Sequence, residues 1–135
     1  MSSAVFGQGT LLKRAGTTVA EVKSITGPGY SRDSIDITNH DSVSSCREFI
    51  GGLVDAGEIS AELNFLPAST TQTIIRDTDM FATAAMAYTL TFPDAATTVC
   101  TVSAWVTGFE VGAPIDDVIP ATLTLKLTGK PTWGP

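Results

Sequence analysis

Residues 57–65 read GEISAELNF, and apolar and polar side chains alternate along this stretch without a break. The apolar set is Ile59, Ala61, Leu63 and Phe65, and the polar set is Glu58, Ser60, Glu62 and Asn64. Successive side chains of a β-strand point to opposite faces, so this period of two predicts a strand with one dry and one wet face. Such half-buried strands are typical of antiparallel or mixed sheets.

The same alternation recurs elsewhere in the chain. It is clear in residues 121–128 and in residues 33–38, which centre on Ile35 and Ile37. Weaker versions, rich in β-branched and aromatic residues, occupy residues 17–25, 86–92 and 98–111. Turns rich in glycine and proline separate these segments. The sequence therefore predicts about six or seven strands.

One segment has the pattern of a helix. Residues 69–72, Ser-Thr-Thr-Gln, have the form of a capping box. Apolar or small residues then recur at helical spacing at Ile74, Ile75, Thr78, Phe81, Ala82 and Ala85. We therefore expect a mainly β fold, a β-sandwich or partial barrel flanked by one α-helix that covers an open side of the sheet.

Residues 39–56 interrupt the strand pattern with serine- and glycine-rich stretches around Phe49, Ile50, Leu53 and Val54. We expect a long loop here. Loops longer than about 12 to 15 residues in a compact domain are usually functional. Apolar side chains on such a loop need a surface to bury them, which points to contact with another protein.

Length and composition limit the class of protein. The 135 residues fit a single domain, 1–135. A net charge of −6 has the wrong sign for holding phosphate backbones, which disfavours nucleic-acid binding. No apolar run approaches the ~20 residues that span a bilayer, so we expect no membrane partner. The first residues, MSSAVFGQGT, lack the pattern of a secretory signal.

The residues that carry catalytic chemistry are few. His40 is the single histidine, and neither Asp41 nor Cys46 beside it belongs to a recognisable catalytic motif. Two cysteines and one histidine are too few for a four-ligand zinc site, and no twelve-residue calcium loop is present. We therefore expect no enzyme activity, no catalytic residue, no metal and no cofactor.

Trp105 lies in residues 99–109, VCTVSAWVTGF, on the same parity as Val99, Thr101 and Ser103. The more apolar parity carries Cys100, Val102, Ala104 and Val106. A large aromatic residue on the wetter face is an interface candidate. Partial burial, or a platform for a ligand such as a sugar, are the alternatives.

Two longer stretches carry a resemblance to a known family. Residues 24–42, SITGPGYSRDSIDITNHDS, are followed by residues 47–65, REFIGGLVDAGEISAELNF. Together they resemble the tail tube, or major tail, proteins of long, non-contractile-tailed phages, and the order of the family's elements is reproduced from about Val22 to Phe92. The resemblance implies a fold related to the tube protein of type VI secretion.

It also implies assembly of the chain with itself into hexameric rings, whose inner sheets join into one barrel and which stack into a tube. The implied partners are a tape-measure protein, tail-end proteins, and DNA that passes through without specific binding. The implied location is the virion tail, after assembly in the host cytoplasm. The sequence leaves open which strand edges pair between subunits.

We assign residue roles on this basis. Glu58 and Glu62 on the wet face of their strand, together with Asp36, are expected to line the lumen. Arg47, Phe49, Ile50 and Leu53 are expected to form a ring-stacking loop, within the inter-subunit loop at 39–56. The alternative function is a carbohydrate-binding or capsid-decoration module that uses Trp105 and the loops as its contact surface.

Overall fold

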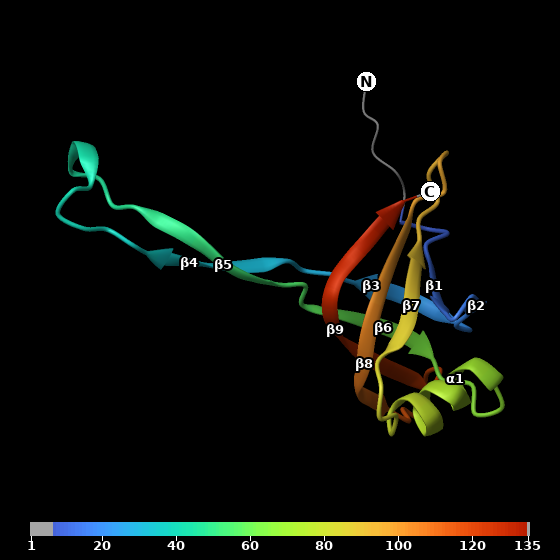
Figure 1. Cartoon of the computed structure of the whole chain (residues 1–135). Helices are drawn as coiled ribbons and strands as arrows, with labels where there is room; N and C mark the ends of the chain where they lie inside the picture. Colours follow the sequence, from blue (N-terminus) through green and yellow to red (C-terminus); the bar gives the residue numbers. More distant parts are fainter. Residues whose placement is uncertain (1–6, 135) are drawn as a thin grey trace.

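The computed structural model describes residues 7–134, which contain nine strands and a short helical segment (Figure 1). The strands are β1 (Leu11–Arg14), β2 (Thr17–Thr18), β3 (Val22–Thr26), β4 (Ser31–Asp36), β5 (Phe49–Asp55), β6 (Glu58–Asn64), β7 (Met86–Thr91), β8 (Val99–Val111) and β9 (Pro120–Gly134). The helical elements are a 3-10 turn, η1 (Val43–Ser45), and α1 (Thr70–Ile74) continued by one π-helical stretch, η2 (Ile75–Asp79).

Seven of the strands form one antiparallel sheet in the order β2-β1-β7-β8-β9-β6-β3. Figure 1 shows a curled sheet in which β8 and β9 are long, bent strands, and α1 lies at one end of the sheet. The other two strands, β4 and β5, pair with each other as a separate hairpin. The expectation of a mainly β fold with one helix is confirmed, and the curled sheet corresponds to the partial barrel.

The dry face of β6 is the centre of the core, as its alternation predicts. Ile59, Ala61 and Leu63 are at most 1% exposed, while Glu58 and Glu62 face solvent. The same periodicity operates on the neighbouring strands β8 and β9 and on β7. The core cluster is completed by Leu12, Val19, Ala56, Ile75, Tyr88, Leu90, Cys100, Val102, Ala104, Val106, Ala121, Leu123, Leu125 and Leu127.

The predicted strand at 17–25 is two strands. Glu21 has a φ of 58°, in the left-handed region, and the extended backbone is interrupted at residues 19–21 between β2 and β3. Strand β1, which the sequence did not predict, pairs with both β2 and β7. The short β1 and β2 are therefore held by pairing rather than by a clear alternation of their own.

The helix is shorter than the helical spacing predicts, because helical structure ends at Asp79 instead of near Ala85. Phe81, expected on the buried stripe, is 79% exposed. The prediction of a capping box is also wrong, since the Ser69 side chain makes no capping hydrogen bond. Gln72 instead accepts a hydrogen bond from the Leu66 amide and donates to the carbonyl oxygens of two other segments, which fixes the helix start to the sheet.

A buried polar cluster fixes the other end of the helical segment. Asp79 is 3% exposed and accepts hydrogen bonds from Arg14 of β1, one of them at 2.8 Å, and from the Tyr88 hydroxyl of β7. Burial raises the pKa of Asp79, but these hydrogen bonds outweigh it and leave that pKa below its ordinary value. The cluster ties the helical segment to two strands of the sheet.

The expected long loop at 39–56 is mostly not a loop, because its second half contains β5. The expected half-buried strand at 33–38 is β4, which extends over Ser31–Asp36 and is exposed at every residue. Ile35 and Ile37 are 49% and 43% exposed. Both differences have one cause. Strands β4 and β5 pair with each other, and neither packs against the core.

Candidate functional site

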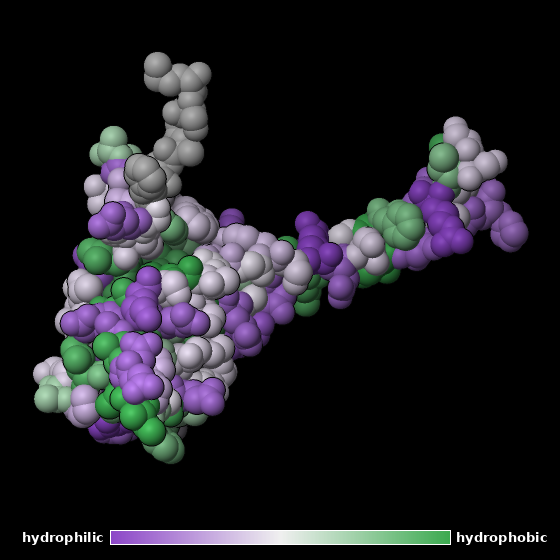
Figure 2. Space-filling view, turned by 180° about the vertical axis from the view of Figure 1, so that it is seen from behind, coloured by the Kyte–Doolittle hydropathy of each residue, from purple (hydrophilic) through white to green (hydrophobic). Residues whose placement is uncertain are grey.

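The β4–β5 hairpin projects from the sheet and its helix (Figure 1), and in the space-filling view it extends into solvent from the body (Figure 2). Apolar side chains are exposed along it, with Leu53 95% and Phe49 53% exposed. We call this group the hairpin apolar set. Its members are Ile35, Ile37, Phe49, Ile50, Leu53 and Val54.

The strands of the hairpin place these residues in pairs. Ile35 lies opposite Ile50, and Asp36 lies opposite Phe49. The Arg32 side chain crosses the hairpin, where its Nε donates to the Gly52 carbonyl oxygen at 2.8 Å. A Cβ atom added to Gly51 would come within 2.4 Å of the Arg32 guanidinium, so the glycine makes room for this crossing. An isolated two-stranded hairpin is at best marginally stable in water.

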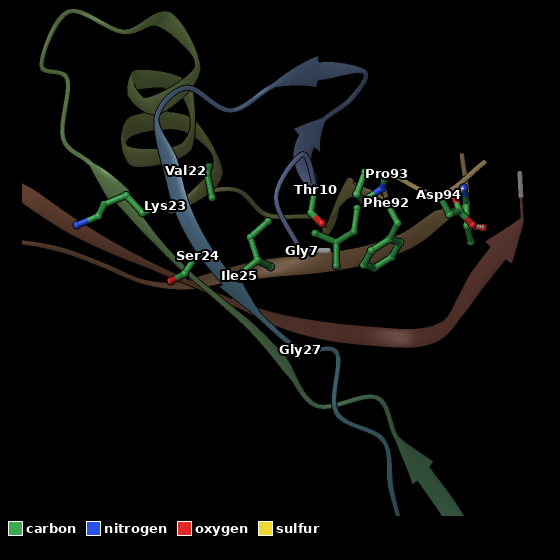
Figure 3. Close-up of a pocket in the computed structure, with 12 residues that line it drawn as sticks. Gly7, Thr10, Val22, Lys23, Ser24, Ile25, Gly27, Phe92, Pro93 and Asp94 are labelled. Atoms are coloured by element: carbon green, nitrogen blue, oxygen red, sulfur yellow. Dashed lines mark hydrogen bonds between the residues drawn. The ribbon is translucent and has the colours of Figure 1, made fainter. Parts of the chain in front are cut away.

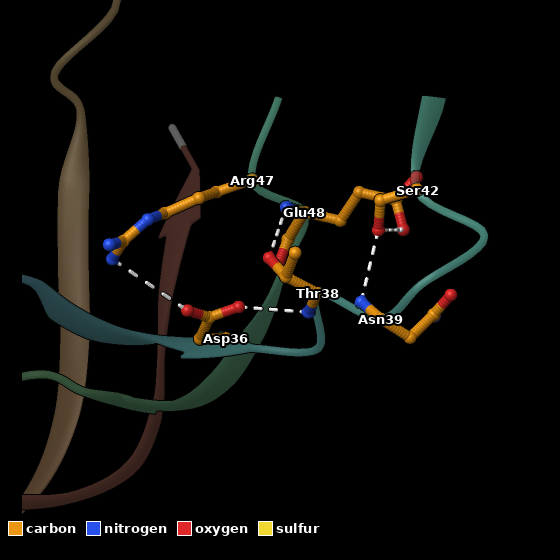
Figure 4. Close-up of polar contacts among 6 residues, drawn as sticks. All are labelled: Asp36, Thr38, Asn39, Ser42, Arg47 and Glu48. Atoms are coloured by element: carbon orange, nitrogen blue, oxygen red, sulfur yellow. Dashed lines mark hydrogen bonds and ion pairs between the residues drawn. The ribbon is translucent and has the colours of Figure 1, made fainter. Parts of the chain in front are cut away.

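The tip of the hairpin is held by polar contacts among its own residues (Figure 4). Asp36 accepts a hydrogen bond from the Thr38 amide at 2.8 Å, and the Thr38 side chain, followed by this amide, lowers the pKa of the Asp36 carboxyl. Ser42 accepts from the Asn39 amide and donates to Glu48. The Arg47 side chain is 79% exposed and lies 4.0 Å from Asp36. The pair is at the outer limit of an ion pair and is exposed to solvent.

Contacts at the root hold the hairpin to the sheet. Trp133 of β9 donates its indole N–H to the Tyr30 hydroxyl at 2.8 Å, and its ring stacks on Phe92. Lys126 of β9 lies 2.9 Å from Asp55. The Gly57 amide and then Lys126 lower the pKa of Asp55. No pattern in the sequence predicts the Tyr30–Trp133 contact, because these residues are far apart in the chain.

The exposed face of the sheet forms a second surface, made of polar side chains from adjacent strands. Glu58 lies opposite Lys126, and Glu62 lies opposite Thr122. Glu110 of β8 also lies opposite Thr122, on its other side. Two carboxylates therefore flank Thr122 on this face. Asp36 lies on the hairpin, in a different sheet, so the structure does not bring it together with Glu58 and Glu62.

The sequence missed Glu110 because of a register shift. The β8–β9 pairing is irregular between Val106 and Gly108. An extra residue in a strand moves every later side chain to the opposite face. Alternation counted from Trp105 therefore assigns Phe109 to the polar face, whereas Phe109 packs against the core and Glu110 takes the polar position.

Trp105 lies on the polar face of β8 and is 39% exposed. Its cross-strand neighbour is Lys126. Trp105 therefore lies on the polar face of the strand, as the alternation in the sequence predicts. Its position is compatible with a contact between proteins.

A groove of about 710 Å³ runs beside β3 (Figure 3). Its apolar lining comes from Val22 and Ile25 of β3 and from Leu90 and Phe92 of β7 and the turn after it. Figure 3 shows Val22 and Ile25 extending from β3 and Phe92 at the other end of the groove, with Gly7 and Thr10, which also line it, between them. Lys23 and Ser24 of β3 also line the groove, so its wall along the last strand of the sheet is partly polar.

Over residues 7–134, no group of three histidine, cysteine, aspartate or glutamate side chains is placed to hold a metal ion. Nor does this part of the chain contain a helix long and apolar enough to cross a membrane. Of the cysteines in this part, Cys46 is exposed at the hairpin tip and Cys100 is buried. Burial raises the pKa of the Cys100 thiol.

The curled sheet with a polar face and the projecting hairpin with exposed apolar side chains are the two main surfaces of this fold. Residues 8–134 match the family described as "Lambda phage tail tube protein, TTP". The chain belongs to this tail tube family, which confirms the resemblance found in the sequence. No curated protein sequence matches the chain.

Solved structures share the fold. A chain of a structure titled "Virion of native gene transfer agent (GTA) particle" aligns with 18% identity, 98% coverage of this chain, 100% of that chain and a TM-score of 0.75. A chain from the sheath/tube terminator of an extracellular contractile injection system, PVC, has 12% identity, 99% coverage of both chains and a TM-score of 0.77. Hcp1 from Flavobacterium johnsoniae has 15% identity, coverage of 93% and 94%, and a TM-score of 0.55.

At these identities the structures establish the fold and not a shared activity. They confirm the tail-tube fold that the sequence indicates.

Proposed function

We propose that the chain is the structural subunit of a phage tail tube, whose copies form hexameric rings that stack into a conduit for DNA ejection. The family match over residues 8–134 carries this proposal. On this view, residues 1–135 act as one tail-tube domain. The subunit makes and breaks no covalent bond, needs no cofactor, and is located in the virion tail after assembly in the host cytoplasm.

The hairpin is the proposed ring-stacking element. Phe49, Ile50 and Leu53 expose apolar area that no other part of the same chain covers in the described residues, and Arg47 presents its charge at the tip. Exposed apolar groups of this kind are typical of protein contact sites. Because the hairpin projects from the sheet, it is able to reach a neighbouring ring in a stack.

The polar face of the sheet is the proposed lumen wall. Glu58 and Glu62 lie on it, with the core on the other side. Carboxylates on a bore would repel DNA phosphates, so the DNA would slide without specific binding. Asp36 would add to this wall only where the hairpin itself lines the bore.

The remaining partners follow from the same role. A tape-measure protein would occupy the bore during assembly, tail-end proteins would cap the tube, and no membrane contact is needed. Trp105 is proposed as a contact between subunits. Family membership is the reason to prefer this function over a carbohydrate-binding or capsid-decoration module.

Electron microscopy of the purified protein tests the proposal. We expect rings or tubes of uniform diameter, formed without any other protein. A stable monomer that forms neither at any concentration, and binds glycans, would instead support the binding module.

A further inference from the structure

The backbone pairing between the hairpin and the sheet is interrupted at the root of the hairpin. In the sheet, Thr26 of β3 lies opposite Ser60 of β6. In the hairpin, Ser31 of β4 lies opposite Asp55 of β5. Within the described residues, no strand pairing joins the two connections between these pairs. The direction of the hairpin relative to the sheet is therefore not fixed by a continuous ladder of backbone hydrogen bonds.

Two glycines allow the two connections to pass close to each other. Gly27 has a φ of 108°, and a Cβ atom added to it would collide with the Glu58 carbonyl oxygen. Gly57 has a φ of 80°, and a Cβ atom there would collide with the Gly29 carbonyl oxygen. Glycine adopts these conformations without steric cost, but its backbone is also the least restricted of all residues. Side chains are therefore needed to fix the direction of the hairpin.

The first such contact joins Tyr30 to Trp133. Tyr30 directly precedes β4, and its hydroxyl accepts a hydrogen bond from the Trp133 indole N–H at 2.8 Å. The Trp133 ring is itself stacked on Phe92, with ring centroids 5.9 Å apart and an angle of 14° between the planes. The indole N–H is thus a donor held by the sheet, and it binds the first connection of the hairpin root.

The second contact joins Asp55 to Lys126. Asp55 is the last residue of β5, and its two carboxylate oxygens lie 2.9 and 3.2 Å from the Lys126 Nζ atom. One of these oxygens also accepts a hydrogen bond from the Gly57 amide at 2.8 Å. Both side chains are exposed, so the ion pair adds little to the stability of the fold. It does bind the second connection of the root to β9.

The two contacts use separate positions of the same strand, and a cavity of about 370 Å³ lies between them. Its lining comes from both sides of the root and from the part of β9 between Lys126 and Trp133. The lining residues are Tyr30, Val54, Ala56, Gly129, Lys130 and Pro131. The root therefore does not pack tightly against this part of β9. Loss of the two contacts would leave it room to move.

We propose that Tyr30 and Asp55 are positioning residues, which bind Trp133 and Lys126 of β9 and so hold the hairpin in one direction before it meets a neighbouring copy. The inference rests on the proposed function, in which the hairpin is the ring-stacking element. A segment that is already oriented loses less conformational freedom when it binds. The two contacts thereby lower the protein concentration at which copies assemble.

A fixed direction is a different property from the strength of the β4–β5 hydrogen bonds. A two-stranded ribbon opens locally even where its root is held. Amide exchange of β5 therefore does not report the direction of the hairpin. A distance between the hairpin tip and the sheet does.

That distance is measurable by double electron–electron resonance on the full-length monomer, below the concentration of assembly. Spin labels are attached to Cys46, exposed at the hairpin tip, and to Ala87→Cys on the exposed side of β7, while Cys100 is buried. We expect a single narrow distance distribution. Combining Tyr30→Phe with Lys126→Met in this labelled chain should replace it by a broad one. A broad distribution without these changes, or an unchanged one with them, would overturn the proposal.

Two control variants separate positioning from a general effect of substitution. Lys126→Arg keeps the positive charge beside Asp55 and should keep the narrow distribution when Tyr30 is intact. Asp77→Asn removes an exposed ion pair with Arg76 on the helical segment, where the two atoms lie 2.8 Å apart. This pair is of the same kind but lies away from the root, so its loss should also leave the distribution narrow. Broadening by Asp77→Asn would overturn the assignment to the root contacts.

The effect on assembly is measured by sedimentation over a dilution series of unlabelled protein. Tyr30→Phe should raise the concentration of half-assembly by about two- to ten-fold, as expected for the loss of one hydrogen bond. Trp133→Phe keeps a ring that is able to stack on Phe92 and should give a similar rise. The double variant should be no worse than either single variant, because both remove the same hydrogen bond. Fully additive effects would contradict the pairing.

The two measurements distinguish failure of the inference from failure of the proposed function. A variant with a broadened distance distribution that assembles at the wild-type concentration would overturn the positioning role, while the tube function would stand. Absence of rings or tubes from the wild-type chain would contradict the proposed function. The distance measurement does not depend on that result, because it is made on the monomer.

Discussion

Strands β5 and β6 have the same length and are neighbours in the sequence, but their surroundings are opposite. In β6 buried and accessible residues alternate, and Ile59 is completely buried. In β5 no residue is buried, and Leu53 is 95% exposed. Strand β6 is stabilised by its own chain, whereas β5 exposes its apolar side chains to solvent in the single chain. Changes in β6 should therefore affect the folding of the monomer, and changes in β5 should affect its assembly.

The largest effect on the folded monomer should come from Leu125→Ala. Leu125 is completely buried opposite Ile59 of β6, so the change removes buried methyl groups and leaves a cavity. We expect the free energy of unfolding to fall by about 3 to 5 kcal/mol. Urea denaturation followed by circular dichroism measures this change. A loss below about 1 kcal/mol would mean that this sheet is not the core.

Asp79→Asn should have the next largest effect, about 2 to 3 kcal/mol, because it removes the charged acceptor for Arg14 and Tyr88. The pKa of Asp79 is lowered in the folded protein. Its stabilising effect is therefore present above the unfolded pKa, about 3.9, and is lost as pH falls through the folded pKa.

Denaturation at several pH values checks the Asp79 prediction. The stability difference between wild type and Asp79→Asn should be constant near neutral pH and shrink below about pH 4. Other carboxylates with lowered pKa, such as Asp55 and Asp94, remain in both proteins and cancel in the difference. A difference that grows on acidification would contradict the assigned role.

Leu53→Ala and Phe49→Ala are the matched changes on the hairpin, and their effect on monomer stability should be within about 0.5 kcal/mol. Their effect on assembly should be large, because apolar anchors at a contact typically cost more than about 1 to 2 kcal/mol when truncated. Sedimentation should show folded monomers that do not form tubes. Unfolding of the Phe49→Ala monomer would place Phe49 in the core instead.

The smallest effect on stability should come from Glu58→Lys combined with Glu62→Lys, since both side chains face solvent. We expect tubes that still assemble but eject DNA more slowly, because phosphates come within a Debye length, about 8 Å, of the new positive charges. Added salt should relieve the defect. Normal ejection by this variant, measured in phage particles that carry it, would show that these charges do not matter.

The parts of the fold that the sequence predicts are those where the core imposes alternation. Strand β6 and the paired stretch of β9 are correctly located, because each buries every second residue. The first strand of the hairpin, β4, is predicted at residues 33–38, but the second, β5, falls in the expected loop at 39–56. Strand β5 has two adjacent glycines and buries nothing, so no pattern marks it as a strand. The resemblance to the tail tube family nevertheless covered this segment.

For the candidate site, the sequence predicts the exposed apolar residues of the hairpin but not every residue of the polar face. Phe49, Ile50 and Leu53 were singled out because apolar residues in a polar segment need a partner, and the structure exposes all of them. Glu110 was not, because a register shift in β8 changes the face of every later side chain. Local periodicity gives the face of a residue only as far as the next bulge.

Amide hydrogen exchange of β5 and β6, compared between monomer and assembled tube, tests the central claim most directly. Amides of β6 should be strongly protected in both states, because the sheet is complete in one chain. Amides of β5 should exchange quickly in the monomer and become protected in the tube, when a neighbouring copy covers the hairpin apolar set. Strong protection of β5 already in the monomer, or no change of β5 on assembly, would contradict the account.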